Sequence, residues 1–141
     1  MTAVDTNILV YAHREELSLH RRARARLLEL AQGRARWAIP VFCLGEFIRV
    51  VSHDRLFDPP FTVEEACEAL DRVLASPSLV VLLPGDRFSP LLCEAVREAN
   101  AVGNLVFDAQ IVALCREAGV RTLLTEDRDF ARFDRFTTAR L

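Results

Sequence analysis

Two carboxylate side chains stand where short apolar segments of the chain end. Asp5 ends the segment Thr2–Asp5, and Asp127 comes shortly after the segment Thr122–Leu124. If both segments are strands of a parallel sheet, their carboxyl ends lie at the same edge. Ligands bind at that edge in open parallel sheets. We therefore expect Asp5 and Asp127 to lie close together.

Two further carboxylates lie in helical segments among apolar neighbours. Asp108 has apolar residues at offsets −3, +3, +4 and +7, and Glu46 has them at −4, −3 and +4. This is the spacing of a buried helical stripe. A charged carboxylate on such a stripe is unfavourable unless it is paired or holds a metal. Arg49 follows Glu46 by three positions, whereas Asp108 has no basic residue within four.

Each acid also has an ordinary structural interpretation. Asp5 could end a strand and start a turn, and Glu46 could be a helix residue in an ion pair. Asp108 could favour the dipole of its helix from the first turn. Asp127 could cap the turn that follows it, and Asp129 fits a cap or a solvated charge better than a site residue. Taken together, the first four acids predict a shared acidic pocket.

Such a pocket would hold a divalent cation, because neighbouring carboxylates raise each other's pKa when no cation compensates them. Oxygen ligands favour Mg²⁺, with Mn²⁺ as an alternative, over Zn²⁺. His13, His20 and His53 lack metal-ligand spacing and are interpreted as surface or structural residues. Acids with a bound magnesium ion suit hydrolysis of phosphodiester bonds.

The elements that must position these acids alternate between short apolar strands and longer helices. The pattern predicts strands at Thr2–Asp5, Arg36–Ile39, Leu79–Leu83 (buried), Thr122–Leu124 and Phe136–Ala139 (an edge strand). It predicts helices at Asn7–Ala12, Leu17–Gln32, Pro40 to about His53, Thr62 to about Ala75, Ser89–Ala99 and Leu105–Ala118, and a helical turn at Asp127–Phe133. Pro40 would open its helix at the first position, and Thr62 with Glu65 forms a capping box. We expect an α/β three-layer sandwich, with a short central parallel sheet of about five strands flanked by helices, in one domain spanning residues 1–141.

The composition limits the classes of protein to consider. The chain has 141 residues, of which 51% are hydrophobic and 27% charged, which is typical of a globular domain. Its net charge is −2 and it contains no lysine, so it does not bind nucleic acid through bulk positive charge. No apolar run is long enough to cross a bilayer, and Met1–Val10 does not resemble a signal peptide. We expect a cytoplasmic protein that makes no membrane contact.

Three other groups of residues have mainly structural interpretations. The four cysteines, Cys43, Cys67, Cys93 and Cys115, have neither zinc-ligand spacing nor a disulfide pattern, and are predicted to be core thiols. Four arginines between Arg21 and Arg26 could contact phosphates but fit a solvated helix face better. The segment Val41–Val51 is apolar almost all round, which predicts burial in the core or at an interface.

Four segments of the chain resemble the motifs of the PIN domain family. They are VDTNILVYA, LGEFIRVV, NLVFDAQIVAL and LLTEDRDF, in the family's order and at suitable spacings. The whole resembles a VapC-type toxin of a type II toxin–antitoxin pair. The resemblance implies a PIN fold and a magnesium-dependent ribonuclease. It carries over Asp5, Glu46, Asp108 and Asp127 as the acidic site, with Asn7 and Thr125 as supporting residues; within that site, Asp5 and Asp108 are the preferred metal ligands.

The resemblance further implies an RNA substrate and a cognate antitoxin protein, and a homodimer agrees with both the family and the apolar segment Val41–Val51. Two alternatives remain open. One is a catalytically idle PIN module that binds RNA or protein, and the other is a PIN nuclease of RNA processing outside toxin–antitoxin systems. A haloacid-dehalogenase phosphatase would need a second aspartate where the chain has Asn7, and a response-regulator receiver would need a lysine.

Overall fold

Five short strands form one fully parallel sheet in the order β3-β2-β1-β4-β5. The computed structural model describes residues 1–141. The strands are β1 (Thr2–Val4), β2 (Trp37–Pro40), β3 (Leu79–Leu82), β4 (Thr122–Leu124) and β5 (Thr137–Ala139). The chain runs outward from β1 to β3 and then returns to the other side of β1. The border between β1 and β4 is therefore the point where the strand order reverses, and ligands bind at such a point in open parallel sheets.

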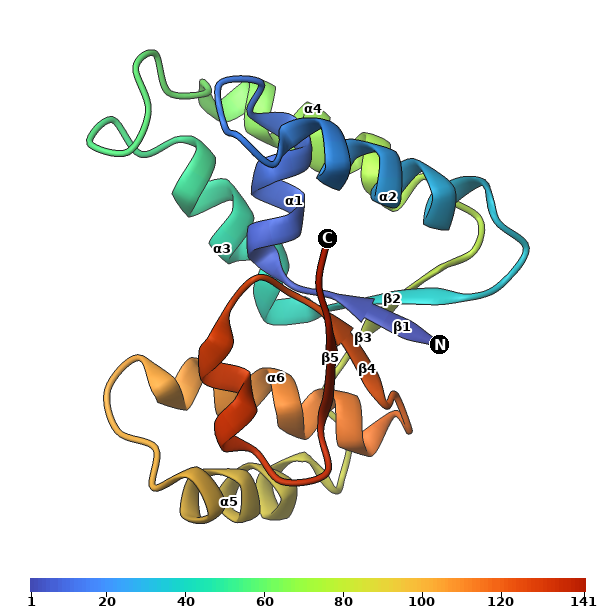
Figure 1. Ribbon diagram of the computed structural model, residues 1–141, viewed down its shortest axis with the longest axis vertical. Helices are drawn as coiled ribbons and strands as arrows, with labels where there is room; N and C mark the ends of the chain where they lie inside the picture. The colour runs from blue at the N-terminus through green and yellow to red at the C-terminus, as the bar shows by residue number, and fades with distance from the viewer.

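Helices cover both faces of this sheet (Figure 1). One layer contains α1 (Thr6–His13), α2 (His20–Gln32), α3 (Val41–Val51) and α4 (Val63–Leu74). The other contains α5 (Phe88–Ala99), α6 (Leu105–Glu117) and the 3₁₀ helix η1 (Arg128–Arg132). The three-layer α/β sandwich expected from the sequence is thus confirmed. No helix combines the length and the apolar character that crossing a bilayer requires.

The core lies between the sheet and each helical layer. Its largest fully buried side chains include Trp37 of β2, Phe47 of α3 and Phe130 of η1. The indole N–H of Trp37 donates to Ser76 Oγ at 3.3 Å, which satisfies its one polar atom. The central strands β1 and β2 are almost wholly buried because both of their faces are covered, and they accordingly consist of apolar residues apart from Thr2 at the start of β1.

Several predicted element boundaries differ from the structure by one to three residues, and two of these differences have a clear physical reason. Pro40 is the last residue of β2 and the N-cap of α3, not its first helical residue. Its φ of −59° suits either state, but its ψ of 134° keeps it extended, in register with Leu82 of β3. The second helix starts at His20 rather than at Leu17, because residues 14–19 form turns that reverse the chain after α1.

Two predictions of burial were also wrong. The strand predicted at Leu79–Leu83 lies at the edge of the sheet, so most of its side chains are only partly buried, and Leu83 lies beyond it, exposed. Among the cysteines, Cys43 and Cys115 are core residues as expected, Cys67 is partly buried, and Cys93 is exposed on α5. The capping box of α4 is present as predicted, with Thr62 and Glu65 each accepting the other's backbone N–H at 3.1 Å.

Candidate active site

Asp5 lies where β1 ends and α1 begins, and it is only 5% exposed. It is the N-cap of α1, and its Oδ1 accepts the backbone N–H of Thr6 at 2.7 Å. Its Oδ2 accepts the side-chain N–H of Asn7 at 2.9 Å and the hydroxyl of Thr125 at 2.7 Å. These donors fix the orientation of the carboxylate and favour its charged form.

Asn7 and Thr125 join the start of α1 to the end of β4. The amide nitrogen of Asn7 also donates to Thr125 Oγ1 at 3.1 Å, and its carbonyl oxygen accepts the backbone N–H of Glu126 at 3.2 Å. Thr125 is 1% exposed, and its Oγ1 accepts the backbone N–H of Asp127 at 3.0 Å. The two residues therefore position both Asp5 and the segment that carries Asp127.

Glu46 projects from the second turn of α3 toward the same edge of the sheet. Its Oε2 accepts the hydroxyl of Thr6 at 2.8 Å, and Thr6 is itself 5% exposed. Its Oε1 lies 3.7 Å from a guanidinium nitrogen of Arg49, in a loose and largely exposed ion pair. A buried neutral donor, rather than a cation, thus orients this carboxylate.

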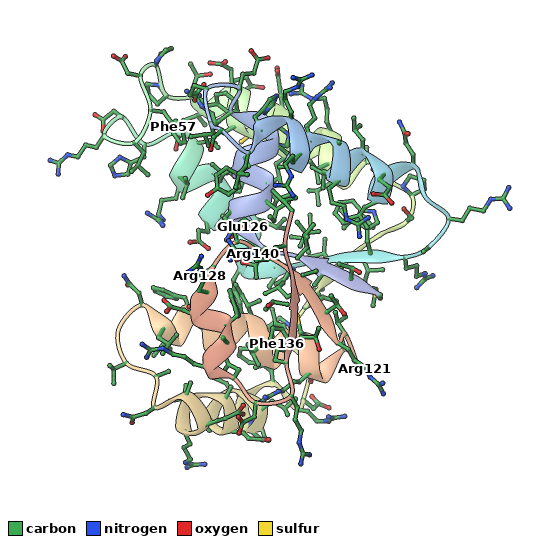
Figure 2. All side chains as sticks on the ribbon, viewed as in Figure 1. Phe57, Arg121, Glu126, Arg128, Phe136 and Arg140 are labelled. Carbon is green, nitrogen blue, oxygen red and sulfur yellow. The ribbon has the colours of Figure 1, made fainter.

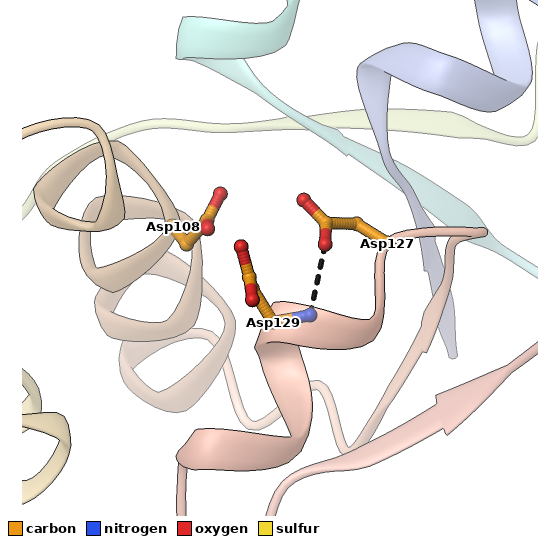
Figure 3. Close-up of side chains that lie close together, drawn as sticks. All are labelled: Asp108, Asp127 and Asp129. Atoms are coloured by element: carbon orange, nitrogen blue, oxygen red, sulfur yellow. Dashed lines mark hydrogen bonds between the residues drawn. The ribbon is translucent and has the colours of Figure 1, made fainter.

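Asp108, Asp127 and Asp129 gather their carboxylates between α6 and η1 (Figure 3). One oxygen of each lies within 4.8 Å of the others. Asp127 is the N-cap of η1 and accepts the backbone N–H of Asp129 at 2.8 Å. Asp127 is therefore both a cap and a member of the acidic group. Asp129, expected to be a cap or a solvated charge, joins the same group and has only a loose contact with Arg132 at 4.0 Å.

One cavity of about 460 Å³ is lined by all four predicted acids and by Asn7. Burial raises the pKa of Asp5 to about 6, against the lowering effect of the Thr125 hydroxyl and the Thr6 amide. Burial likewise raises the pKa of Asp108 to about 7, and the nearby charges of Asp127, Asp5, Asp129 and Glu46 raise it further. The protein thus holds several mutually repelling carboxylates in one partly desolvated space.

The charges around this cavity leave the acids largely uncompensated. Asp5, Asp108 and Asp127 form no ion pair, and the contacts of Arg49 and Arg132 are long and exposed. Oxygen-only donors with excess negative charge fit a hard divalent cation. A cation held by Asp5 and Asp108 would stabilise their charged forms, which burial and, to a smaller extent, mutual repulsion disfavour.

The structure brings the predicted site residues together and adds two that were not predicted to belong to the site, Thr6 and Asp129. Thr6 has no motif signal beyond its place after Asp5. Asp129 has one, because it lies two positions after Asp127 within the motif LLTEDRDF. The Cys43 thiol also lies beneath the site, with Sγ 3.9 Å from Asp5 Oδ1.

Residues interpreted as structural lie outside this cavity. His13 Nδ1 contacts the carbonyl oxygen of Leu9, and His20 Nδ1 contacts that of Tyr11, each at 2.8 Å. In the arginine-rich segment of α2, Arg26 pairs with Glu29 at 2.6 Å on the exposed surface. These contacts agree with helix ends and a solvated face.

Glu126 ties the C-terminal segment to the site. Its carboxylate accepts Arg140 at 2.6 Å and the backbone N–H of Leu141 at 2.8 Å, and these bonds lower its pKa. Figure 2 shows Glu126 and Arg140 close together beside α1. Because Glu126 stands between Thr125 and Asp127, this contact braces the segment that carries them.

Comparisons with known proteins agree with one another. The family model described as the PIN domain matches residues 2–136. The VapC ribonuclease Mb2897 of Mycobacterium bovis is 38% identical over 135 residues, which cover 96% of this chain and 91% of that protein. Two solved structures, each 20% identical, share the fold. VapBC2 from Rickettsia felis, bound to a promoter DNA fragment, has a TM-score of 0.71 and covers 99% of this chain and 98% of its own. VapC20 from Mycobacterium tuberculosis, a Sarcin-Ricin loop cleaving toxin, has a TM-score of 0.67 and covers 93% of each chain.

Proposed function

Because this chain belongs to the PIN domain family, we propose that it is a magnesium-dependent endoribonuclease that hydrolyses RNA at its acidic cavity. The observation that carries the proposal is the cavity that Asp5, Glu46, Asp108 and Asp127 line together with little compensating positive charge. The relative at 38% identity is named a ribonuclease, and it matches nearly the whole chain. The activity therefore rests on a residue arrangement and on a family that agree.

The residues of the cavity would have different roles in the reaction. Asp5 and Asp108 would hold the cation, and Asn7 and Thr125 keep Asp5 in one orientation. A bound Mg²⁺ lowers the pKa of water and neutralises charge on the phosphate. Glu46 and Asp127 remain to accept a proton from the attacking water. Hydrolysis by water leaves a 5′-phosphate and a 3′-hydroxyl.

Cleavage of single-stranded RNA by the purified protein tests this proposal. The wild type is assayed with Mg²⁺, with Mn²⁺ and with EDTA, beside Asp5→Asn and Asp108→Asn. We expect metal-dependent cleavage that both substitutions abolish, while circular dichroism shows that both variants fold. Metal-loaded wild type that cleaves no RNA would contradict the proposal, and full activity of Asp5→Asn would contradict the assigned site.

We further propose that the nuclease is the toxin of a toxin–antitoxin pair and acts in the cytoplasm. The names of the relatives support this, and the PIN family model, which matches residues 2–136, supports one PIN domain over residues 1–141. The partner would be a small antitoxin that inhibits cleavage. Co-expression with the product of an adjacent gene tests the pairing. Co-purification of the two proteins and loss of RNase activity would support it. A ribonuclease that no product of a neighbouring gene binds or inhibits would point to RNA processing instead.

A homodimer is the expected oligomer. On α3, Phe42 is 38% exposed, and on α6, Phe107 is 62% exposed; the two line one surface hollow. Exposed apolar residues that gather on one surface often mark an interface. Light scattering should give twice the 15.9 kDa mass of one chain, and Phe107→Asp should give the monomer. A monomeric wild type would contradict this proposal.

The alternative of an idle binding module is less favoured. In a module that only binds RNA, several uncompensated, partly buried carboxylates would weaken binding, because they repel the phosphates of the RNA. Binding of RNA in EDTA with equal affinity in wild type and in Asp108→Asn, without cleavage under any metal, would support the idle module.

A further inference from the structure

The cavity that contains the acids continues along an apolar wall that phosphodiester hydrolysis does not use. Besides the acids, its lining includes Val10, Tyr11, Leu17, Val50, Leu56 and Phe57. Helices α1 and α3 both start at the sheet edge and run away from it. Tyr11 lies more than one turn beyond Thr6, and Val50 lies one turn beyond Glu46. One helical turn advances about 5 Å along the helix axis. The apolar wall therefore lies about one helical turn farther from the sheet than the acids.

A buried arginine holds this wall in place. Arg14 directly follows α1 and is only 6% exposed. Its guanidinium carbon lies 4.3 Å from the ring centre of Phe57 and 4.7 Å from that of Phe61. Its Nη2 donates to the carbonyl oxygen of Pro59 at 2.8 Å, and its Nε donates to Glu16 at 2.5 Å.

These contacts fasten the loop between α3 and α4 to the end of α1. Burying a guanidinium is unfavourable unless hydrogen bonds and stacking replace its water. Here they do, and the result is a fixed position for Phe57, which lies on this loop beyond α3 (Figure 2). The neighbouring Leu56 remains 56% exposed at the cavity.

The chemistry beside this wall favours an unpaired nucleobase. A substrate phosphate at the acids places its own bases within reach of the next turn of α1 and α3. Aromatic and apolar side chains bind the faces of any base. The chain has a net charge of −2 and no lysine. Overall positive charge therefore contributes little to its affinity for the phosphates of the RNA backbone. Base contacts are then needed for binding, and they require a base that is unstacked from its neighbours.

We propose that the part of this apolar wall formed by Tyr11, Leu17, Leu56 and Phe57 is a nucleobase subsite next to the scissile phosphate. Arg14 is the positioning residue that holds Phe57 in it. This inference rests on the proposed ribonuclease activity, and it adds that the enzyme reads an unpaired base beside the bond that it cuts.

An abasic scan tests the subsite. The wild type with Mg²⁺ is first given a pool of random-sequence single-stranded RNA, and the cleaved position is mapped. A short RNA around that position is then made with one base removed at a time. Stacking of one base contributes roughly 5- to 150-fold in affinity. We expect removal of one base beside the scissile bond to raise KM about tenfold with little change in kcat.

The variants connect that base to the wall. Phe57→Ala and Leu56→Ala should raise KM on the complete RNA and leave a much smaller further penalty for the missing base. Arg14→Lys keeps the charge but loses the planar group between the rings, and it should behave in the same way with kcat retained. Val63→Ala, which removes an apolar side chain 73% exposed outside the cavity, is the control and should match the wild type.

The failures can be told apart. A wild type that cleaves no RNA refutes the ribonuclease, and the subsite with it. A wild type that cleaves, but for which no single base matters, refutes the subsite alone and leaves the wall to a polypeptide partner. Equal abasic penalties in wild type and in Leu56→Ala also refute it; Leu56 is exposed, so this variant remains informative even if Phe57→Ala does not fold.

Discussion

Replacing Asp108 with asparagine should stabilise the metal-free protein at neutral pH while abolishing hydrolysis. In the folded chain, burial and the neighbouring carboxylates raise the pKa of Asp108 from 3.8 to about 7. A raised carboxyl pKa means that the folded state holds its proton more tightly than the unfolded state does. The metal-free wild type therefore loses stability as the pH rises from about 4 through about 7, and asparagine escapes that loss.

The size of the effect follows from the two pKa values and from the exposure of the side chain. The full difference corresponds to at most about 4 kcal/mol of unfolding free energy at neutral pH. Asp108 is only partly buried, so solvent screens its interactions, and we expect about 1–2 kcal/mol. For a domain of this length, that gain raises the Tm by roughly 3–8 °C.

Thermal melts in EDTA at pH 7.5 and pH 4 measure this effect. The Tm difference should be clear at pH 7.5 and small at pH 4, which lies close to the pKa of 3.8 in the unfolded state, so that the loss has barely begun. Asp86→Asn, which neutralises an exposed loop aspartate away from the cavity, should change little at either pH. With Mg²⁺ the order should reverse, because only the wild type gains binding energy, about 2.7 kcal/mol at one hundred times the Kd. An Asp108→Asn variant that melts at or below the wild type in EDTA at pH 7.5 would refute the reasoning.

Three other substitutions test the contacts around the acids. Thr6→Val removes the hydroxyl that donates to Glu46, and steady-state RNA cleavage should show kcat reduced roughly tenfold with KM nearly unchanged. Thr125→Val removes one hydrogen-bond donor to Asp5 and the acceptor of the Asp127 backbone N–H. Urea unfolding should show that the free energy of unfolding falls by about 2–3 kcal/mol. Arg140→Ala breaks an exposed ion pair, and the same urea experiment should show a loss of only about 0–1 kcal/mol. A large stability loss in the last variant would mean that the C-terminal contact does more than brace a loop.

The parts of the site that follow strands were predictable, because strand direction alone places them. Once β1 and β4 are both parallel strands, Asp5 and Thr125 must meet at one edge of the sheet. Asp108 was predictable for another reason, since an acid on a buried helical stripe has few structural explanations. Motif spacing then placed Glu46 with them, and the structure brings all four acids into one cavity.

The features that the sequence did not reveal depend on contacts between distant segments. The bond from Thr6 to Glu46 spans 40 positions, and no local pattern indicates it. The exposure of β3 depends on its place in the strand order, which its apolar residues do not encode. Arg14 looks like an ordinary charged residue after a helix, and its burial depends on two rings more than 40 positions later.

The pairing of β1 with β4 also determines when the nuclease can exist during synthesis. Thr125, which fixes Asp5, is translated 120 positions after it. Contacts between such distant positions form slowly, because a long loop must close first. A nascent chain still attached before Asp127 emerges carries only part of its acids and no fixed Asp5. A complete acidic site therefore forms only after almost the whole of this sequence has been translated and folded.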